Sequence, residues 1–163
     1  MDFDLTEEQV QLRDAARKLA QHEFRDKAAR WDREEAFPEE NKHRLAELGY
    51  LGLSVDKEYG GSGAGLVSTY LVIEELAKVD LLTAMIVHDQ NVSPRIIANH
   101  GPDELKRRLV PRFVSGELEC SIAWTEPQAG SDGTAIRTAA VRDGDKYLIN
   151  GSKIFTTFGD RAD

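Results

Sequence analysis

Apolar and polar residues alternate with a helical period over most of the first 116 residues. Thr6 and Gln9 have the spacing of a capping box, in which each side chain bonds to the other residue's backbone amide. The apolar residues that follow recur at helical spacing, with charged residues between them. We expect this first helix to run past Phe24 and to fray near Trp31.

Two further helices are predicted after the first one. One is predicted over 38–48, because Pro38 suits a first helical turn and Gly49 suits a helix stop. The other is predicted over 66–79, where a wide apolar face indicates a central and largely buried helix. Between them lies a glycine-rich segment without the Lys-Ser or Lys-Thr pair of a phosphate loop, so we interpret it as an irregular connection.

The pattern continues with a helix over about 81–99, capped by Asp80. Pro94 is expected to kink or split this helix, since proline lacks the backbone N–H that a helix interior uses. A last helix carries a basic, solvated face, and Pro111 is expected to break it before the chain reaches Gly116.

Beyond Gly116 the helical period is lost. Apolar residues come in short runs, and Asp143-Gly144 and Asn150-Gly151 are hairpin turn signals. The fold class is therefore α+β, with an all-α helical domain over 1–116 and the incomplete start of an antiparallel β domain over 117–163. Strands are expected near four ranges: 119–125, 137–142, 146–149 and 152–158.

Composition narrows the possible functions. Hydrophobic residues make up 40% and charged residues 31% of the 163-residue chain, a globular composition. The net charge of −8 argues against nucleic acid as a partner. No stretch of this sequence is apolar enough to span a membrane, and we expect no secretory signal because these residues show no basic segment followed by an apolar run before the first helix. Cys120 is the only cysteine, so a reducing, cytoplasmic location is expected.

The stretch from Ile122 to Asp132 carries the first candidate chemistry. A short apolar run ends at a hydroxyl residue, and a rigid Glu-Pro step leads into a turn of small residues. Gly130 permits a positive φ and a close ligand approach, and successive amides in such a turn can bind an anion. The alternative is an ordinary exit from a strand into a loop, because these are common turn residues.

The segment 152–158 is the second candidate. Strict strand alternation would place Phe155 and Thr157 on one face. An aromatic ring beside a hydroxyl group suits a flat heteroaromatic ligand. The alternative is that threonine and phenylalanine are simply good strand formers.

Other polar residues give weaker signals. Glu74 and Glu75 are adjacent and could form a catalytic carboxylate pair. Neighbouring helical residues point about 100° apart, however, so we expect one of the two to face solvent instead. His88 has no partner at the i+4 spacing of a metal pair, so a packed or hydrogen-bonded histidine is favoured over a ligand. No metal site is predicted.

Both candidate stretches resemble one known family. Thr125-Glu126-Pro127 followed by Ala129-Gly130-Ser131-Asp132 resembles the flavin-binding signature of the acyl-CoA dehydrogenases. The segment 153–157 is similar to that family's second flavin-contacting segment. Three positions depart from the family pattern: Trp124 replaces an aliphatic residue, Phe155 a tryptophan, and Phe158 a frequent asparagine.

The resemblance implies an FAD site. Backbone contacts would come from Ile122, Ala123 and Trp124, and a hydroxyl contact from Thr125. Gly130 and Ser131 would contact the pyrophosphate or the acyl-CoA substrate. In the second segment Phe155 would flank the isoalloxazine, Thr157 would bond near N5, and Thr156 would belong to the same site.

The resemblance also implies the reaction and the partners. The family transfers hydrogen from the α and β carbons of an acyl-CoA thioester to give a trans-2-enoyl-CoA, as in fatty acid metabolism. Electron-transfer flavoprotein would be the acceptor, and a homo-oligomer, dimer or tetramer, is expected. The open alternatives are an acyl-CoA oxidase or flavin monooxygenase of the same fold, and a non-catalytic helical interaction module.

The family's catalytic glutamate has no match in this sequence, so no catalytic residue is assigned. Family chains continue with the rest of a β-barrel middle domain and a helical bundle. We therefore expect these residues to be the N-terminal helical domain and the first part of the middle domain, either as a fragment or as one piece of a split enzyme.

Overall fold

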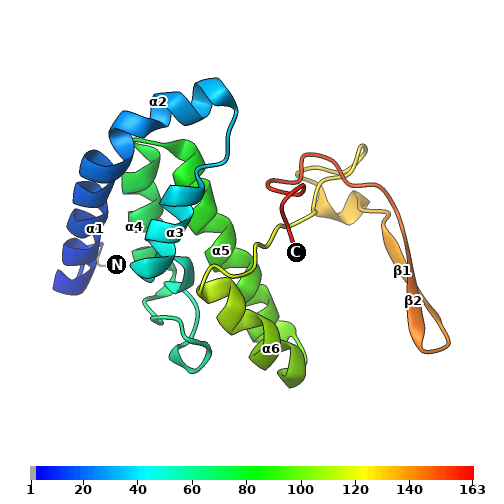
Figure 1. The fold of residues 1–163 in the computed structure, drawn as a ribbon. Helices are drawn as coiled ribbons and strands as arrows, with labels where there is room; N and C mark the ends of the chain where they lie inside the picture. The colour runs from blue at the N-terminus through cyan, green and yellow to red at the C-terminus, as the bar shows by residue number, and fades with distance from the viewer. Residues whose placement is uncertain (1–2) are drawn as a thin grey trace. The chain divides into compact units, whose positions relative to one another are not determined.

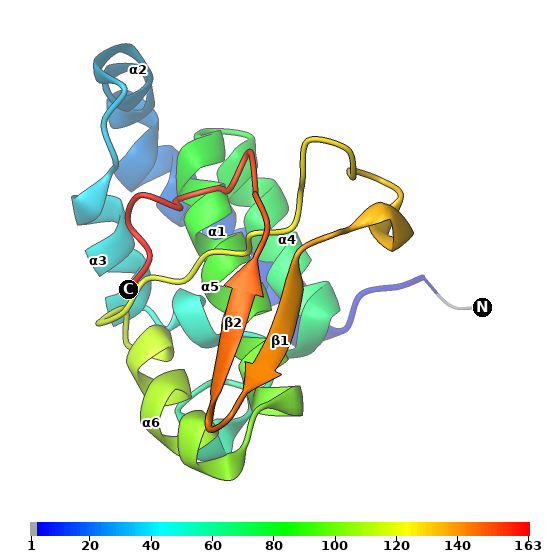
Figure 2. The same ribbon diagram turned by 90° about the vertical axis from the view of Figure 1, so that its right-hand side faces the viewer.

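The computed structural model describes residues 3–163. The chain folds as two compact units, Met1–Cys120 and Ser121–Asp163 (Figures 1 and 2). The first contains the α-helices and the second the only β-hairpin of the described residues, in agreement with the predicted α+β class. Within residues 3–163, no helix is both long and apolar enough to cross a lipid bilayer.

The first helix begins as its sequence predicts. The Thr6 hydroxyl accepts from the Gln9 amide at 3.2 Å, and the Gln9 side chain accepts from the Thr6 amide at 3.0 Å, so the capping box is confirmed. The helix runs on without interruption through three segments, α1 (Glu7–Leu19), the π-helical turn η1 (Ala20–Phe24) and α2 (Arg25–Glu34).

Four more α-helices complete the first unit. They are α3 (Glu39–Glu47), α4 (Gly65–Ala77), α5 (Leu81–His100) and α6 (Asp103–Val114), with short 3₁₀ turns η2 (Tyr50–Gly52) and η3 (Lys57–Tyr59) between α3 and α4. α4 packs against both α1 and α5, and α6 packs against α5 (Figure 1). The core is formed by fully buried side chains from several of these segments: Leu45, Leu51, Val72, Leu76 and Val87.

The buried face of α4 differs from the one predicted. Leu66 and Val67 are exposed at its first turn, whereas Ser68 and Thr69 are buried. The Thr69 hydroxyl donates to the Gly65 carbonyl at 2.8 Å, which allows this polar side chain to be buried without an unmet hydrogen bond. Hydrophobicity alone therefore overestimates the width of the buried stripe.

Neither proline interrupts its helix. α5 continues through Pro94 and α6 continues through Pro111, so the predicted split of one and break of the other are wrong. A proline removes one N–H from a helix, and this loss is local. α5 also packs against α4 and α6, so both helices have tertiary contacts in addition to their own backbone bonds.

The glycine-rich connection is closed by its own backbone. The Ser62 amide donates to the Gly52 carbonyl and the Gly63 amide to the Val55 carbonyl, both at 2.9 Å. A Cβ at Gly61 would lie 2.0 Å from the Val55 carbonyl oxygen, so only glycine allows this approach. The glycines therefore serve packing, in line with the interpretation as a connection.

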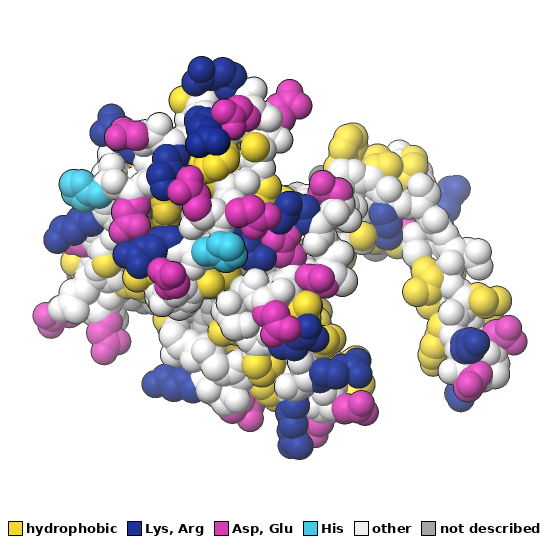
Figure 3. Space-filling view, viewed as in Figure 1, with side chains coloured by type: hydrophobic (Ala, Val, Ile, Leu, Met, Phe, Trp, Pro, Cys, Tyr) yellow, Lys and Arg dark blue, Asp and Glu magenta, His cyan; other side chains and the backbone are white. Residues whose placement is uncertain are grey.

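The second unit contains one hairpin of β1 (Ala139–Asp143) and β2 (Lys146–Asn150). Asp143 lies opposite Lys146 and Ala139 opposite Asn150, so Gly144-Asp145 forms the loop. The strands predicted here are confirmed, but Asn150-Gly151 is not a hairpin turn because it ends β2. Every residue of both strands is exposed, and apolar side chains follow the hairpin in Figure 3.

The strands predicted over 119–125 and 152–158 are absent as regular strands. Phe155 and Phe158 both have φ of +54°, in the left-handed region. Strict alternation requires extended backbone at every residue, so the predicted face shared by Phe155 and Thr157 is not formed by a strand. The chain instead turns after Thr156, where the Gly159 amide donates to the Thr156 carbonyl at 3.1 Å.

Candidate functional site

The two stretches selected from the sequence lie side by side in the second unit. The Ile154 amide donates to the Thr125 carbonyl at 2.9 Å, and the Ser121 hydroxyl donates to the Thr157 carbonyl. These contacts join 121–125 to 154–157 in antiparallel order. Tertiary structure therefore brings the two candidate segments together without forming a regular ladder between them.

Glu126 is the central polar residue of this arrangement. Its side chain is buried and accepts hydrogen bonds from the Arg137 amide at 2.8 Å and the Thr138 amide at 2.9 Å. The Lys153 ammonium lies 2.9 Å from the same carboxylate. The nearby Thr138 side chain, the Arg137 amide and Lys153 hold the pKa of Glu126 well below its usual range. At neutral pH the group is thus a charged anchor.

Sequence reasoning misses this anchor. The sequence presents Glu126 as a carboxylate that does not match the family's base, and Lys153 as the first residue of a segment. The periodicity of apolar residues and the spacing of motifs describe single segments only. They therefore cannot pair Glu126 with Lys153, which lies on another segment. The available signal is the Glu-Pro step between an apolar run and a turn, because a carboxylate buried there requires a partner.

The turn after Pro127 is held by backbone bonds. The Glu126 amide donates to the Ala129 carbonyl at 2.9 Å, and the reverse bond measures 3.1 Å. These two bonds reverse the direction of the chain. Gly130 does not adopt a positive φ, although glycine would permit one there. A Cβ at Gly130 would meet no atom within 4 Å, so the space beside it is open.

The turn continues into η4 (Gly133–Ala135). The Asp132 carboxylate accepts from the Thr134 amide at 3.0 Å and from its hydroxyl. The hydroxyl, followed by the amide, lowers the pKa of Asp132. Gly130 and Ser131 therefore lie just before a rigid, hydrogen-bonded turn.

The predicted site residues lie at or near the surface of the unit. Three are partly buried and six are exposed: Ile122, Thr125 and Thr156 in the first group, and Ala123, Trp124, Gly130, Ser131, Phe155 and Thr157 in the second. Two features suit a flat heteroaromatic ligand with a phosphate tail. The aromatic side chains of Trp124 and Phe155 are available for stacking, and hydroxyl groups are available as hydrogen-bond partners.

Trp124 also has a structural contact. A Cβ at Gly133 would lie 3.0 Å from Cζ2 of the indole ring, so the ring packs closely on this glycine. The residue that departs from the family pattern is therefore accommodated by the absence of a side chain at position 133.

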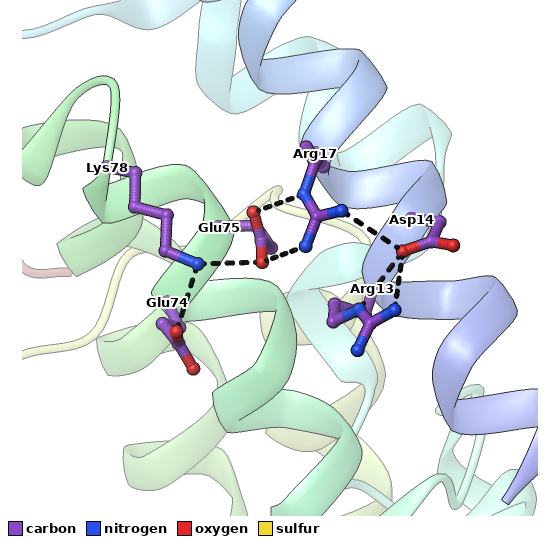
Figure 4. A network of polar contacts seen from close by, with 6 residues as sticks. All are labelled: Arg13, Asp14, Arg17, Glu74, Glu75 and Lys78. Carbon is purple, nitrogen blue, oxygen red and sulfur yellow. Dashed lines mark hydrogen bonds and ion pairs between the residues drawn. The ribbon is translucent and has the colours of Figure 1, made fainter. Parts of the chain in front are cut away.

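The adjacent carboxylates of α4 have different environments. Glu75 is buried, accepts two bonds from the Arg17 guanidinium at 2.9 and 3.0 Å, and is 2.8 Å from Lys78 (Figure 4). Hydrogen bonds from Arg17 and Lys78 lower the pKa of Glu75 to about 2. Glu74 is exposed, as expected for one member of the pair. Glu75 thus joins α1 to α4, and the two carboxylates do not form an acid–base pair.

His88 is hydrogen-bonded, as the sequence favoured. Its Nδ1 lies 2.7 Å from Oδ1 of Asp89. Burial raises the pKa of Asp89, and the neighbouring imidazole opposes that shift. Among residues 3–163 no group of three histidine, cysteine, aspartate or glutamate side chains is arranged to hold a metal ion.

Two family models match the chain. Residues 6–117 match the acyl-CoA dehydrogenase N-terminal domain, and residues 121–163 match the acyl-CoA dehydrogenase middle domain. The two matched ranges cover the helical unit and the unit that contains both candidate segments.

Known proteins give the same result. The chain is 40% identical to a short-chain specific acyl-CoA dehydrogenase of Clostridium acetobutylicum, covering 100% of this chain and 43% of that protein. It is 38% identical to an acryloyl-CoA reductase (NADH) of Anaerotignum propionicum, covering 99% and 42% respectively. A glutaryl-CoA dehydrogenase of Mycobacterium smegmatis, solved in complex with FADH2, matches with a TM-score of 0.90 at 29% identity, covering 98% and 41%.

The chain thus spans about two fifths of the length of the relatives it matches. The similarity nevertheless extends over nearly all of its own residues, in both sequence and fold. With both domain models matched in order, the chain belongs to the acyl-CoA dehydrogenase family.

Proposed function

We propose that this chain supplies the N-terminal domain and part of the flavin site of an FAD-dependent acyl-CoA dehydrogenase. The single observation that carries the proposal is the contact between 121–125 and 154–157, since both segments carry the family's flavin signature. The reaction would convert a saturated acyl-CoA to its trans-2-enoyl-CoA. Electron-transfer flavoprotein would be the acceptor, and the working form would be a dimer or tetramer.

The residues of this chain would bind and orient FAD, which supplies hydride acceptance when bound. The backbone of 122–124 and the Thr125 hydroxyl would contact the ring system from one segment. Phe155 would flank it from the other segment, with Thr156 and Thr157 as polar partners. Gly130 and Ser131 would contact the pyrophosphate or the acyl-CoA, where the open space beside Gly130 permits close approach.

Neither Glu75 nor Glu126 is assigned the proton-accepting role. The oxygens of both carboxylates are engaged by cationic side chains or amides, so neither is free to approach an α-carbon proton. A base must lie within about 3 Å of that proton, directly or through one water. In the proposed enzyme this carboxylate would come from the part of the family's length that these 163 residues do not span.

The test is anaerobic reduction of the flavin in the full-length protein. Purified protein should be yellow, and a panel of saturated acyl-CoAs should bleach the oxidised flavin band with at least one member. Rapid reoxidation by oxygen would instead favour an acyl-CoA oxidase or flavin monooxygenase. A colourless protein that does not take up added FAD would contradict the proposal and favour a non-catalytic module.

A second candidate is the reverse reaction. It is favoured by the 38% identity to an acryloyl-CoA reductase (NADH), which nearly equals the identity to the dehydrogenase. The same preparation should be incubated with NADH and a short 2-enoyl-CoA. NADH oxidation that depends on the enoyl-CoA, without flavin bleaching by saturated acyl-CoAs, would identify the reductase.

Thr157→Val tests the site assignment. Loss of the hydroxyl should slow flavin reduction more than it weakens acyl-CoA binding, because a donor near N5 acts mainly in the transition state. Losing one such donor typically costs about 3 kcal/mol of activation free energy. Stopped-flow reduction measures the effect, with Ser152→Ala, which removes an exposed hydroxyl of the same unit, as a control. An unchanged reduction rate would refute the role of Thr157.

A further inference from the structure

Lys153 makes two contacts with the first flavin segment. Its Nζ donates to the Trp124 carbonyl at 2.9 Å and lies 2.9 Å from Oε1 of Glu126. The Lys153 side chain is 23% exposed and that of Glu126 only 2%. This charge pair is thus largely withdrawn from solvent. The attraction between two charges is stronger in such a partly buried position than at an open surface.

Glu126 extends the connection to a third segment. Its two oxygens also accept the amides of Arg137 and Thr138, which lead directly into β1. One carboxylate and one ammonium group therefore connect the turn at 126, the start of the hairpin and the second flavin segment. We refer to the pair Glu126 and Lys153 as the clasp.

The clasp lies directly before a disfavoured backbone conformation. Phe155 is 88% exposed and has φ of +54°, which side-chain-bearing residues rarely adopt. Such a conformation persists only where its surroundings fix it. The side chain of Lys153 and the amide of Ile154 supply that fixation, because both bond to the first segment just before Phe155.

We propose that Glu126 and Lys153 are positioning residues that set the spacing between the two flavin segments. The clasp holds Trp124 and Thr125 at a fixed distance from Phe155, so that a flavin meets both segments at once. The inference rests on the proposed function and adds to it two residues that contact the cofactor only through others. Because misplacing a positioned group by about 1 Å can cost roughly 100-fold in rate, a small shift of either segment would be measurable.

The experiment compares Lys153→Met with Lys146→Met in the full-length protein. Both variants lose one positive charge in the same unit, but Lys146 is an exposed residue of β2. We expect Lys153→Met to raise the Kd for FAD about tenfold or more, to shift the visible absorption bands of bound flavin, and to lower kcat more than it raises KM for acyl-CoA. Lys146→Met should match the wild type, and Lys153→Arg should recover part of the loss.

A second measurement covers the case in which Lys153→Met does not fold. Glu126→Gln keeps the shape of the side chain and removes its charge. Hydrogen exchange of the FAD-free protein should then show faster exchange at 121–126 and 153–158 than in the wild type, with the helical unit unchanged. Unchanged exchange in both segments would overturn the clasp.

The outcomes distinguish failure of the clasp from failure of the proposed function. If the wild type itself takes up no FAD, the proposed function fails. If the wild type binds FAD and Lys153→Met binds it with the same Kd and spectrum, the clasp inference fails and the proposed function stands. Equal losses in Lys153→Met and Lys146→Met would also overturn the clasp, because charge rather than position would explain them.

Discussion

The two units are stabilised in different ways. The helical unit buries many apolar side chains, and the buried Asn91 side chain forms hydrogen bonds within it. In the second unit both strands are exposed along their length. Its segments are held together by backbone hydrogen bonds and by the Glu126–Lys153 ion pair. A two-stranded hairpin is only marginally stable in water by itself. The comparison shows that one chain can combine a unit held by apolar burial with one held by polar contacts.

The largest expected difference between the units concerns apolar side chains. Leu76→Ala in α4 should destabilise the protein by about 2–5 kcal/mol, because it opens a cavity in the core. Leu148→Ala in β2, where the side chain is 54% exposed, should change stability by no more than about 0.5 kcal/mol. Urea unfolding followed by circular dichroism measures both. Similar losses would contradict the contrast between the units.

Buried polar groups give a second, smaller effect in the helical unit. The Asn91 side chain accepts from the Ser54 amide at 2.9 Å and donates to the Tyr50 and Val87 carbonyls at 2.8 Å. Asn91→Ala should cost about 1–3 kcal/mol in total, because it leaves the buried Ser54 amide without its acceptor. Asn99→Ala, exposed on the same helix, is the matched control and should be nearly neutral. Equal unfolding midpoints for the two variants would show that Asn91 is dispensable.

Acid should weaken the contact between α1 and α4. The pKa of Glu75 is lowered to about 2 in the folded protein, from an ordinary 4.5. A lowered pKa gives stability that is present above about 4.5 and is lost as the pH falls towards 2. Glu75→Gln should remove this pH dependence of the free energy of unfolding. The pH-dependent part should be about 1 kcal/mol or less, since Arg17 is half exposed and water screens its charge.

The matched control is Glu74→Gln, whose carboxylate is exposed and 3.0 Å from Lys78. It should keep the acid dependence of the wild type. Unfolding free energies measured across this pH range check the contrast, and the assignment to Glu75 is wrong if the two variants have the same pH profile.

The smallest effect is expected in the hairpin loop. Gly144 has φ of +63°, so Gly144→Ala forces a disfavoured conformation on a residue with a side chain. The cost of about 1 kcal/mol should fall on the hairpin and leave the unfolding of the helical unit unchanged. NMR shifts of β1 and β2, compared with those of α4, measure it. Changes throughout the helical unit would show that the two units are energetically coupled.

The sequence by itself determined the elements whose causes are local. The capping box at Thr6, the cap at Asp80 and the hairpin strands are set by residues within a few positions of one another. It also indicated the two candidate flavin segments, because their residue types resemble the family signature. At Pro94 and Pro111 the predicted interruptions were wrong, because a proline removes only one N–H and both α5 and α6 continue through it.

Only the tertiary structure decided how the candidate site is assembled. Lys153 meets the Trp124 carbonyl across 29 positions of sequence, and Glu126 reaches the amides 11 and 12 positions ahead. The left-handed backbone of Phe155, which breaks the predicted strand, lies between two contacts to the first segment, that of the Ile154 amide with the Thr125 carbonyl and that of the Thr157 carbonyl with the Ser121 hydroxyl. Such pairings have no period and no fixed spacing, because the free energy of a contact depends on distance in space and not along the chain.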